Sequence, residues 1–141
     1  MYNIEFYKLD EVENSKLLYA VIMAKYNEEW IFVRHKERDT WEVPGGHREV
    51  DEEINDTASR ELFEETGAVD YELTPICIYS VDNSQGKSFG QLFYGEITKL
   101  DKLPDSEIGE VSFFKTLPEN LTYPFIQPFL FEKVSSAIGA I

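Results

Sequence analysis

The chain has 141 residues, 43% of them hydrophobic, which suits one globular domain with its own core. Its 27 acidic residues outnumber 13 basic ones, and the net charge of −14 disfavours a surface for nucleic-acid polymers or anionic membranes. The single Cys77 excludes a disulfide within the chain, and the first residues lack the basic and then apolar run of a signal peptide, so we expect a cytoplasmic protein.

The first predicted elements are strands. Residues 3–9 alternate weakly between apolar and polar side chains, as an edge strand does. The run at 17–24 is almost continuously apolar and predicts a central strand that is buried on both faces. Turn residues at 26–29 separate it from a second apolar run at 30–33, so we predict an antiparallel hairpin.

The densest basic patch of the chain follows this hairpin, at residues 34–39. An arginine binds phosphate oxygens with two donors at once, and the patch lies just before a glycine-rich segment. We therefore name Arg34 and Arg38 as candidate substrate-binding residues; the alternative is an ordinary polar loop.

Pro44, Gly45 and Gly46 come next and predict a flexible turn. Because glycine has no Cβ, the bare backbone of this turn can offer a carbonyl to a cation or approach a phosphate closely. His47 follows, and we expect it to be an exposed loop side chain; the alternative is contact with a phosphate.

Spacing then predicts a helix that ends at Gly67. Ile54, Ala58 and Leu62 recur every four residues and form one apolar stripe. The acids at 51–53 offer an N-cap and suit the positive end of the helix dipole, while glycine is the usual residue just after a helix.

Three acids of this helix are crowded together. Glu61, Glu64 and Glu65 lie three and four residues apart, so we expect them to project from one side. Such carboxylates repel one another unless a cation neutralises them, and ligands made only of oxygen favour Mg²⁺ or Mn²⁺. Arg60 lies four residues before Glu64 and is placed to pair with it. A solvated acidic face is the alternative for an isolated run of this kind.

The stretch from Gly46 to Ala68 resembles the Nudix box, the signature of hydrolases that act on nucleoside diphosphates linked to another moiety X. It reads G-x5-E-x7-R-E-U-x-E-E-x-G-U, where U is aliphatic. Ala68 is smaller than the usual last residue, and Asp51 stands where many members have glycine. The matching positions are Gly46, Glu52, Arg60, Glu61, Leu62, Glu64, Glu65 and Gly67.

This resemblance implies an α/β fold, a Nudix-type α/β/α sandwich with a mixed β-sheet between helices. It implies one domain over residues 1–141, with the box at 46–68, and metal-dependent hydrolysis of a phosphoanhydride. Arg60 would orient Glu64, and Glu61 is one candidate for the general base. The implied ligands of Mg²⁺ or Mn²⁺ are Glu61, Glu64, Glu65, the Gly45 carbonyl and, as an anchor or further ligand, Glu52; Gly46 is implied to contact substrate.

After the helix, strands are predicted at 73–81 and 89–97, with an irregularity at Pro75 and a turn at 82–87. A polar loop at 100–109 and a short strand complete this part of the chain.

Family members often draw a further metal ligand or general base from this loop. Glu110 is our first candidate for that acid and Glu107 the second, and the alternative for each is a solvated loop acid.

The terminal segment predicts a helix from about Gln127, because Pro124 and Pro128 are tolerated only near a helix start. In MutT-like members a residue near the start of this helix reads the base, and Asn120 has both a donor and an acceptor for that purpose. The alternative is stacking of the base on Tyr123 or Phe125. The predicted core stripe of the helix is Ile126, Leu130, Val134 and Ile138.

The first-choice substrate is a nucleoside triphosphate, with an oxidised purine as one variant, cleaved to monophosphate and pyrophosphate as in the MutT-like branch. Alternatives within the family are a nucleotide-sugar, ADP-ribose or dinucleoside polyphosphate pyrophosphatase. An alternative of another class is a sensor domain that binds nucleotide without turnover, against which the complete box argues. We expect a monomer or homodimer whose partner is a small-molecule nucleotide.

Overall fold

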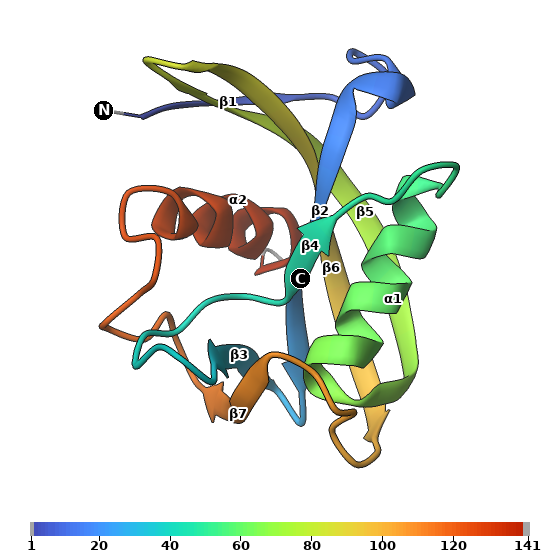
Figure 1. The fold of residues 1–141 in the computed structure, drawn as a ribbon, viewed down its shortest axis with the longest axis vertical. Helices are drawn as coiled ribbons and strands as arrows, with labels where there is room; N and C mark the ends of the chain where they lie inside the picture. Colours follow the sequence, from blue (N-terminus) through green and yellow to red (C-terminus); the bar gives the residue numbers. More distant parts are fainter. Residues whose placement is uncertain (1, 140–141) are drawn as a thin grey trace.

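The computed structural model describes residues 2–139, which form three layers (Figure 1). A seven-stranded mixed sheet lies between helices α1 and α2, so the predicted α/β/α sandwich is confirmed. The strand order is β1-β5-β6-β2-β3-β7, and β4 pairs with β2 off this path. The elements are β1 (Asn3–Tyr7), the 3₁₀ helix η1 (Asn14–Lys16), β2 (Leu17–Tyr26), β3 (Glu29–His35), β4 (Gly45–His47), α1 (Ile54–Thr66), β5 (Ala68–Asn83), β6 (Gly86–Leu100), β7 (Ile108–Phe114) and α2 (Gln127–Gly139).

Strand β2 is the centre of the sheet. It runs parallel to β6 and antiparallel to β3 and β4, so the predicted central strand and its hairpin with β3 are confirmed. The hairpin turns at Asn27 and Glu28, whose φ angles of 51° and 67° match the twist of a two-residue turn. Side chains of β2 alternate between the two layers: Ile22 packs in the core below α1, and Met23 packs in the core below α2.

Strands β5 and β6 are longer than predicted. They form a ribbon that continues well beyond the apolar runs at 73–81 and 89–97, because backbone hydrogen bonds between the two strands extend their pairing into exposed residues. The register shifts between Pro75 and Cys77, at the predicted irregularity. At the turn, the Asn83 side chain accepts a hydrogen bond from the Gln85 amide at 2.8 Å.

Helix α1 begins later than its acidic residues suggest. Its N-cap is Glu53, whose side chain makes no capping hydrogen bond, and Asp51 has a φ of 63° that is incompatible with a helix. The predicted end is confirmed, since Gly67 has a φ of 82° and its amide donates to the Phe63 carbonyl at 2.9 Å. A Cβ at Gly67 would lie 2.5 Å from the Asp101 carbonyl oxygen, so the tight stop and the close packing both require glycine.

Helix α2 begins at Gln127, as predicted, and covers the opposite face of the sheet (Figure 1). Leu130 and Val134 are fully buried there against Phe32 and its neighbours. Within residues 2–139, neither helix is long and apolar enough to cross a bilayer.

Candidate active site

The glycine-rich segment is a strand and not the flexible turn that we predicted. Gly45–His47 forms β4, paired antiparallel with β2 at positions 19–21. Neither glycine has a positive φ. A Cβ at Gly45 would lie 2.6 Å from the Ala20 carbonyl oxygen, and a Cβ at Gly46 would overlap the Glu61 carboxylate. Both residues are glycine because two neighbours approach the backbone closely.

Arg60 is the centre of the acidic site. Its Nε and Nη2 donate to the two Glu52 oxygens at 2.8 and 3.0 Å, and its Nη1 donates to Glu61 and to Glu64, both at 3.1 Å. Nη2 also reaches the His47 carbonyl at 3.1 Å. One guanidinium therefore holds three carboxylates and ties α1 to β4.

Glu52 is fixed from several sides. Its Oε1 accepts hydrogen bonds from the Thr57 hydroxyl at 2.6 Å and from the Glu49 amide at 3.0 Å, besides the contact with Arg60. The hydrogen bond from Arg60, aided by that from Thr57, lowers the pKa of Glu52 to about 2. This acid anchors the loop before α1 to the guanidinium.

The box acids differ in their surroundings, although we predicted that all three project from one side. Glu61 and Glu65 turn toward β4: Glu61 lies against Gly46, and Glu65 accepts a hydrogen bond from the Gly45 amide at 3.1 Å. Burial raises the pKa of Glu61 and raises that of Glu65 to about 8. Glu64, in contrast, is 45% exposed. Glu61 and Glu65, which are four residues apart, therefore both point inward, whereas Glu64 lies at the rim of the site.

The acids meet in a hollow of about 310 Å³. Within residues 2–139, no three acid, imidazole or thiol groups lie close enough together to hold a metal ion in this arrangement. Instead, Nη1 of Arg60 lies between the carboxylates of Glu61 and Glu64 and donates to both. The chemistry of the donors nevertheless fits a hard divalent cation, because every polar side-chain atom that lines the hollow is an oxygen. Two of its acids, Glu61 and Glu65, are partly buried and have raised pKa values. The lining residues are Glu61, Glu64, Glu65, Asp105, Ser106 and Glu107.

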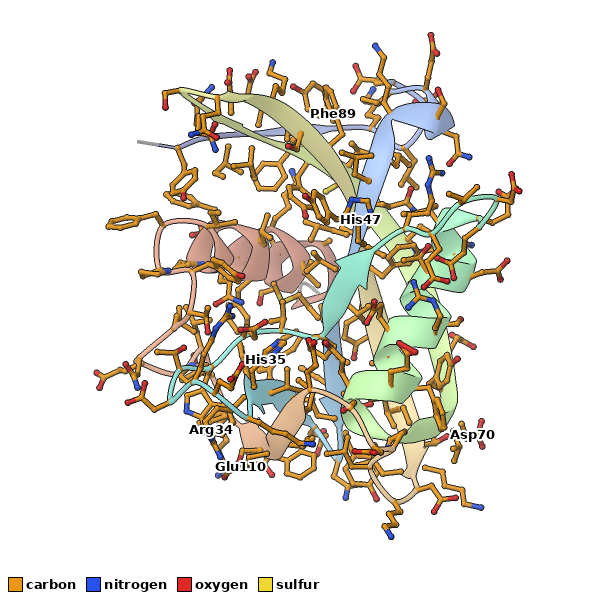
Figure 2. All side chains as sticks on the ribbon, viewed as in Figure 1. Arg34, His35, His47, Asp70, Phe89 and Glu110 are labelled. Atoms are coloured by element: carbon orange, nitrogen blue, oxygen red, sulfur yellow. The ribbon has the colours of Figure 1, made fainter. Side chains whose placement is uncertain are left out.

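The structure separates our two candidate acids outside the box. Glu107, our second choice, lines the hollow. Glu110, our first choice, lies on β7 directly opposite Arg34 of β3, and its Oε1 is 3.3 Å from Nη2 of Arg34 (Figure 2). Glu110 does not line the hollow, because the register of β3 and β7 places it opposite Arg34.

A second cavity, of about 420 Å³, lies on the other side of β4, between the sheet and α2. Its walls are mainly apolar and aromatic, as is typical of pockets for small ligands. Gly46 and Tyr123 line it, as does His47, which packs edge-on against Tyr19 at 5.0 Å between ring centroids. The other lining residues are Val21, Glu42, Val43, Gly45, Tyr79, Val81, Ser88, Ile126, Gln127 and Leu130.

The predicted substrate-binding residues lie in different places. Arg38 donates to Glu42, which lines the cavity, at 3.2 Å. Arg34 lies on β3, pairs with Glu110 and donates to the Arg38 carbonyl at 2.7 Å, so it supports the loop that carries Arg38. Asn120 does not line the cavity, because its side-chain amide donates to the Asp39 carbonyl at 2.8 Å.

Sequence reasoning missed Glu42 and Gln127. Glu42 follows Trp41 in a short bridge with β3, where the Glu42 amide and carbonyl exchange hydrogen bonds with Val33. Gln127 is 3% exposed; with its amide oriented to satisfy both partners, it donates to the Trp41 carbonyl and accepts from the Val43 amide. A polar residue inside an apolar terminal segment is the one signal that marks Gln127 in the sequence.

Comparison with known proteins agrees with the fold and the box. A model of the NUDIX domain matches residues 16–127, and the chain belongs to this family. Over 102 residues it is 31% identical to YtkD, a candidate 8-oxo-dGTP diphosphatase of Bacillus subtilis, covering 72% of this chain and 64% of that protein. The chain thus spans less than two thirds of the length of this relative.

Solved structures show the same fold. The Bacillus subtilis pyrophosphohydrolase BsRppH superimposes with a TM-score of 0.78 at 24% identity, covering 94% of this chain and 90% of that one. A UDP-X diphosphatase superimposes with a TM-score of 0.75 at 20% identity, covering 94% of this chain and 68% of that one.

Proposed function

We propose that the chain is one Nudix domain over residues 1–141 that hydrolyses a phosphoanhydride in a nucleoside diphosphate linked to another moiety. The observation that carries this proposal is the pair of hollows on the two sides of β4: one is lined by the acids of the box helix, and the other has aromatic walls. Polyphosphate bound across β4 would lie next to the first, with the base in the second.

The residues of the acidic hollow fit Mg²⁺ or Mn²⁺. Glu61, Glu64 and Glu65 would hold the cation, with the Gly45 carbonyl as a further ligand and Glu52 in support. A bound cation would neutralise charge on the phosphates, lower the pKa of water and weaken the repulsion between this acidic protein and a polyanionic substrate.

The residues of the chain itself orient the carboxylates and accept the proton of the attacking water. Arg60 orients Glu61 and Glu64 through one nitrogen and is held in turn by Glu52. The proton of the attacking water passes to a carboxylate of the hollow, Glu61 or Glu107. Glu107 replaces Glu110 in this proposal because it lies with the box acids.

The proposed substrate is a nucleoside triphosphate, cleaved to monophosphate and pyrophosphate. The similarity to YtkD supports this choice, since a triphosphate is the substrate in that protein's name. The aromatic cavity supports a base-containing substrate in general.

A substrate panel tests the proposal. Purified protein with Mg²⁺ is incubated with nucleoside triphosphates, 8-oxo-dGTP, nucleotide sugars, ADP-ribose and a dinucleoside tetraphosphate, and products are identified by ³¹P NMR. We expect pyrophosphate and a monophosphate from a triphosphate. Faster turnover of a sugar nucleotide or ADP-ribose would make that compound the substrate in place of a triphosphate. Nucleotide binding without turnover of any compound would favour a sensor domain. Glu61→Gln protein is the control for contaminating hydrolases.

A further inference from the structure

The side chain of Tyr79 lies flat across a neighbouring strand. Gly90 of β6 is the register partner of Tyr79 on β5 and also of Tyr19 on β2, so it lies between them. A Cβ at Gly90 would lie 2.6 Å from Cε1, Cζ and Oη of Tyr79, which means that the hydroxyl end of the ring covers the glycine. The ring therefore reaches from β5 across β6 toward Tyr19, and position 90 is glycine because this ring takes the space of a side chain.

This row of residues forms the sheet-side wall of the aromatic cavity. Tyr79 packs in the core below α2, and Tyr79, Tyr19 and His47 all line the cavity. Tyr19 is the register partner of His47 on β4, which Figure 2 labels, and the two rings pack edge-on. The row thus leads from the Tyr79 hydroxyl to β4, across which the proposed function places the polyphosphate.

The hydroxyl of Tyr79 is buried and unpaired. Tyr79 is 6% exposed, and its hydroxyl has no hydrogen-bond partner within residues 2–139, whereas the Tyr7 hydroxyl pairs with Ser80 at 3.1 Å. Ser135 Oγ is the one unpaired side-chain oxygen or nitrogen of the described chain that is closed off from solvent, so the Tyr79 hydroxyl adjoins open space, and that space is the cavity. Burial raises the pKa of Tyr79, so its hydroxyl stays protonated and can both donate and accept.

An unpaired hydroxyl in an apolar wall favours a ligand that supplies its partner. The base is the part of a nucleotide that fits such walls, because its flat ring can pack against aromatic side chains while nitrogen and oxygen atoms lie at its edge. The phosphates belong elsewhere, since the acids of the box helix line the hollow on the other side of β4.

We propose that Tyr79 is a specificity-determining residue whose hydroxyl forms a hydrogen bond with a polar atom on the edge of the base. This inference rests on the proposed function for the location of the base in the aromatic cavity. The hydroxyl can donate to a ring nitrogen or carbonyl oxygen and can accept from an N–H group. It therefore selects against a ring system whose edge offers only C–H groups, because such a ligand leaves the hydroxyl unpaired.

Binding of nucleoside monophosphates tests this inference without hydrolysis. Wild-type protein and Tyr79→Phe are titrated in Mg²⁺ buffer with GMP, AMP, CMP, UMP and indole riboside 5′-monophosphate, whose ring has the size of a purine but only C–H groups at its edge. We expect wild type to bind its preferred natural nucleotide about fivefold or more tightly than the indole compound. In Tyr79→Phe the Kd of that nucleotide should rise about threefold to tenfold, while the Kd of the indole compound stays level or falls.

Tyr71→Phe is the matched control. It removes the same atom from the same strand on the α1 side of the sheet, so it should leave all five Kd values unchanged. The melting temperature of ligand-free Tyr79→Phe should stay level or rise slightly, because no hydrogen bond is lost.

An equal loss for the indole compound would overturn the inference, because the hydroxyl would then contact the sugar or phosphate. Unchanged binding of every nucleotide by Tyr79→Phe would also overturn it, as would wild-type protein that binds all five compounds equally or none of them. Should Tyr79→Phe fail to fold, the ranking of the five compounds by wild type still decides. Base-dependent loss of binding in a protein without turnover would refute the proposed activity alone, whereas turnover with an unchanged kcat/KM in Tyr79→Phe would refute this inference alone.

Discussion

The Glu61 carboxylate lies against Gly46 in the space that a side chain at position 46 would need, so β4 and α1 fix each other's geometry. Position 46 is glycine because the acid lies against its Cα. The orientation of Glu61 thus depends on the residue that is missing a side chain as well as on Arg60.

Gly46→Ala should therefore damage activity more than folding. The added methyl group displaces the Glu61 carboxylate, and a misplaced reacting group of this kind lowers kcat by about a hundredfold. Steady-state kinetics and thermal melting would measure both effects. Gly139→Ala is the control, because a Cβ there meets nothing within 4 Å. An alanine variant with wild-type kcat would show that the position of Glu61 is not critical.

Glu61→Gln and Glu64→Gln should each lower kcat by on the order of 10³, about 4 kcal/mol of barrier, because an amide keeps the shape and removes the charge that we propose binds the cation. In metal-free buffer the melting temperature should stay level or rise slightly, since a crowded and, for Glu61, partly buried charge has been removed. Mg²⁺ should stabilise wild type more than either variant. Paired kinetics and melting decide, and variants that are inactive only because they unfold would contradict a role in metal binding.

Removal of divalent ions should abolish turnover. The hollow contains only oxygen ligands, and the chain carries a net charge of −14, so a polyanion approaches poorly without a cation. EDTA should stop hydrolysis, added Mg²⁺ should restore it, and the KM should fall as Mg²⁺ rises from limiting to saturating. Full activity in metal-free buffer would refute the mechanism.

Arg38→Ala should raise KM with little change in kcat, because Arg38 contacts the cavity wall and lies away from the acids. Arg34→Ala should have a smaller effect, since Arg34 pairs with Glu110 and reaches the cavity only through the Arg38 carbonyl. Kinetics on both variants would measure the difference. Identical KM values for the two variants and wild type would make this basic segment an ordinary polar loop.

Cys77 should react slowly with thiol reagents in the native protein. It is 6% exposed, and burial raises the pKa of its thiol, so less of the reactive thiolate is present at a given pH. The rate of reaction at pH 8 should increase sharply in urea, where the thiol is released from the α2 layer. Equal rates in native and unfolded protein would show that this layer opens readily.

The features that sequence predicted well are periodic or depend on one residue's conformation. The stripe of Ile54, Ala58 and Leu62 is buried, and Gly67 ends the helix in the left-handed region. These outcomes follow from local rules that tertiary contacts do not override here.

The features that sequence did not predict depend on neighbours far along the chain. Glycine marks turns and close contacts alike, and only the position of Glu61 shows that Gly46 belongs to the second kind. Likewise, Glu110 and Glu107 look equivalent until the β3–β7 register pairs Glu110 with Arg34. The aromatic cavity was missed because its walls come from β2, β4, β5, β6 and α2 together.

The parallel pairing of β2 with β6 has a consequence for how the chain folds. Leu17 and Phe89, which face each other in this pair, are separated by half the chain, and contacts of such long range form slowly. A growing chain on the ribosome releases the box helix before β6, so β2 then lacks the neighbour that pairs along most of its length. The acids are therefore synthesised early and brought to their final positions late, when the β5–β6 hairpin joins the sheet.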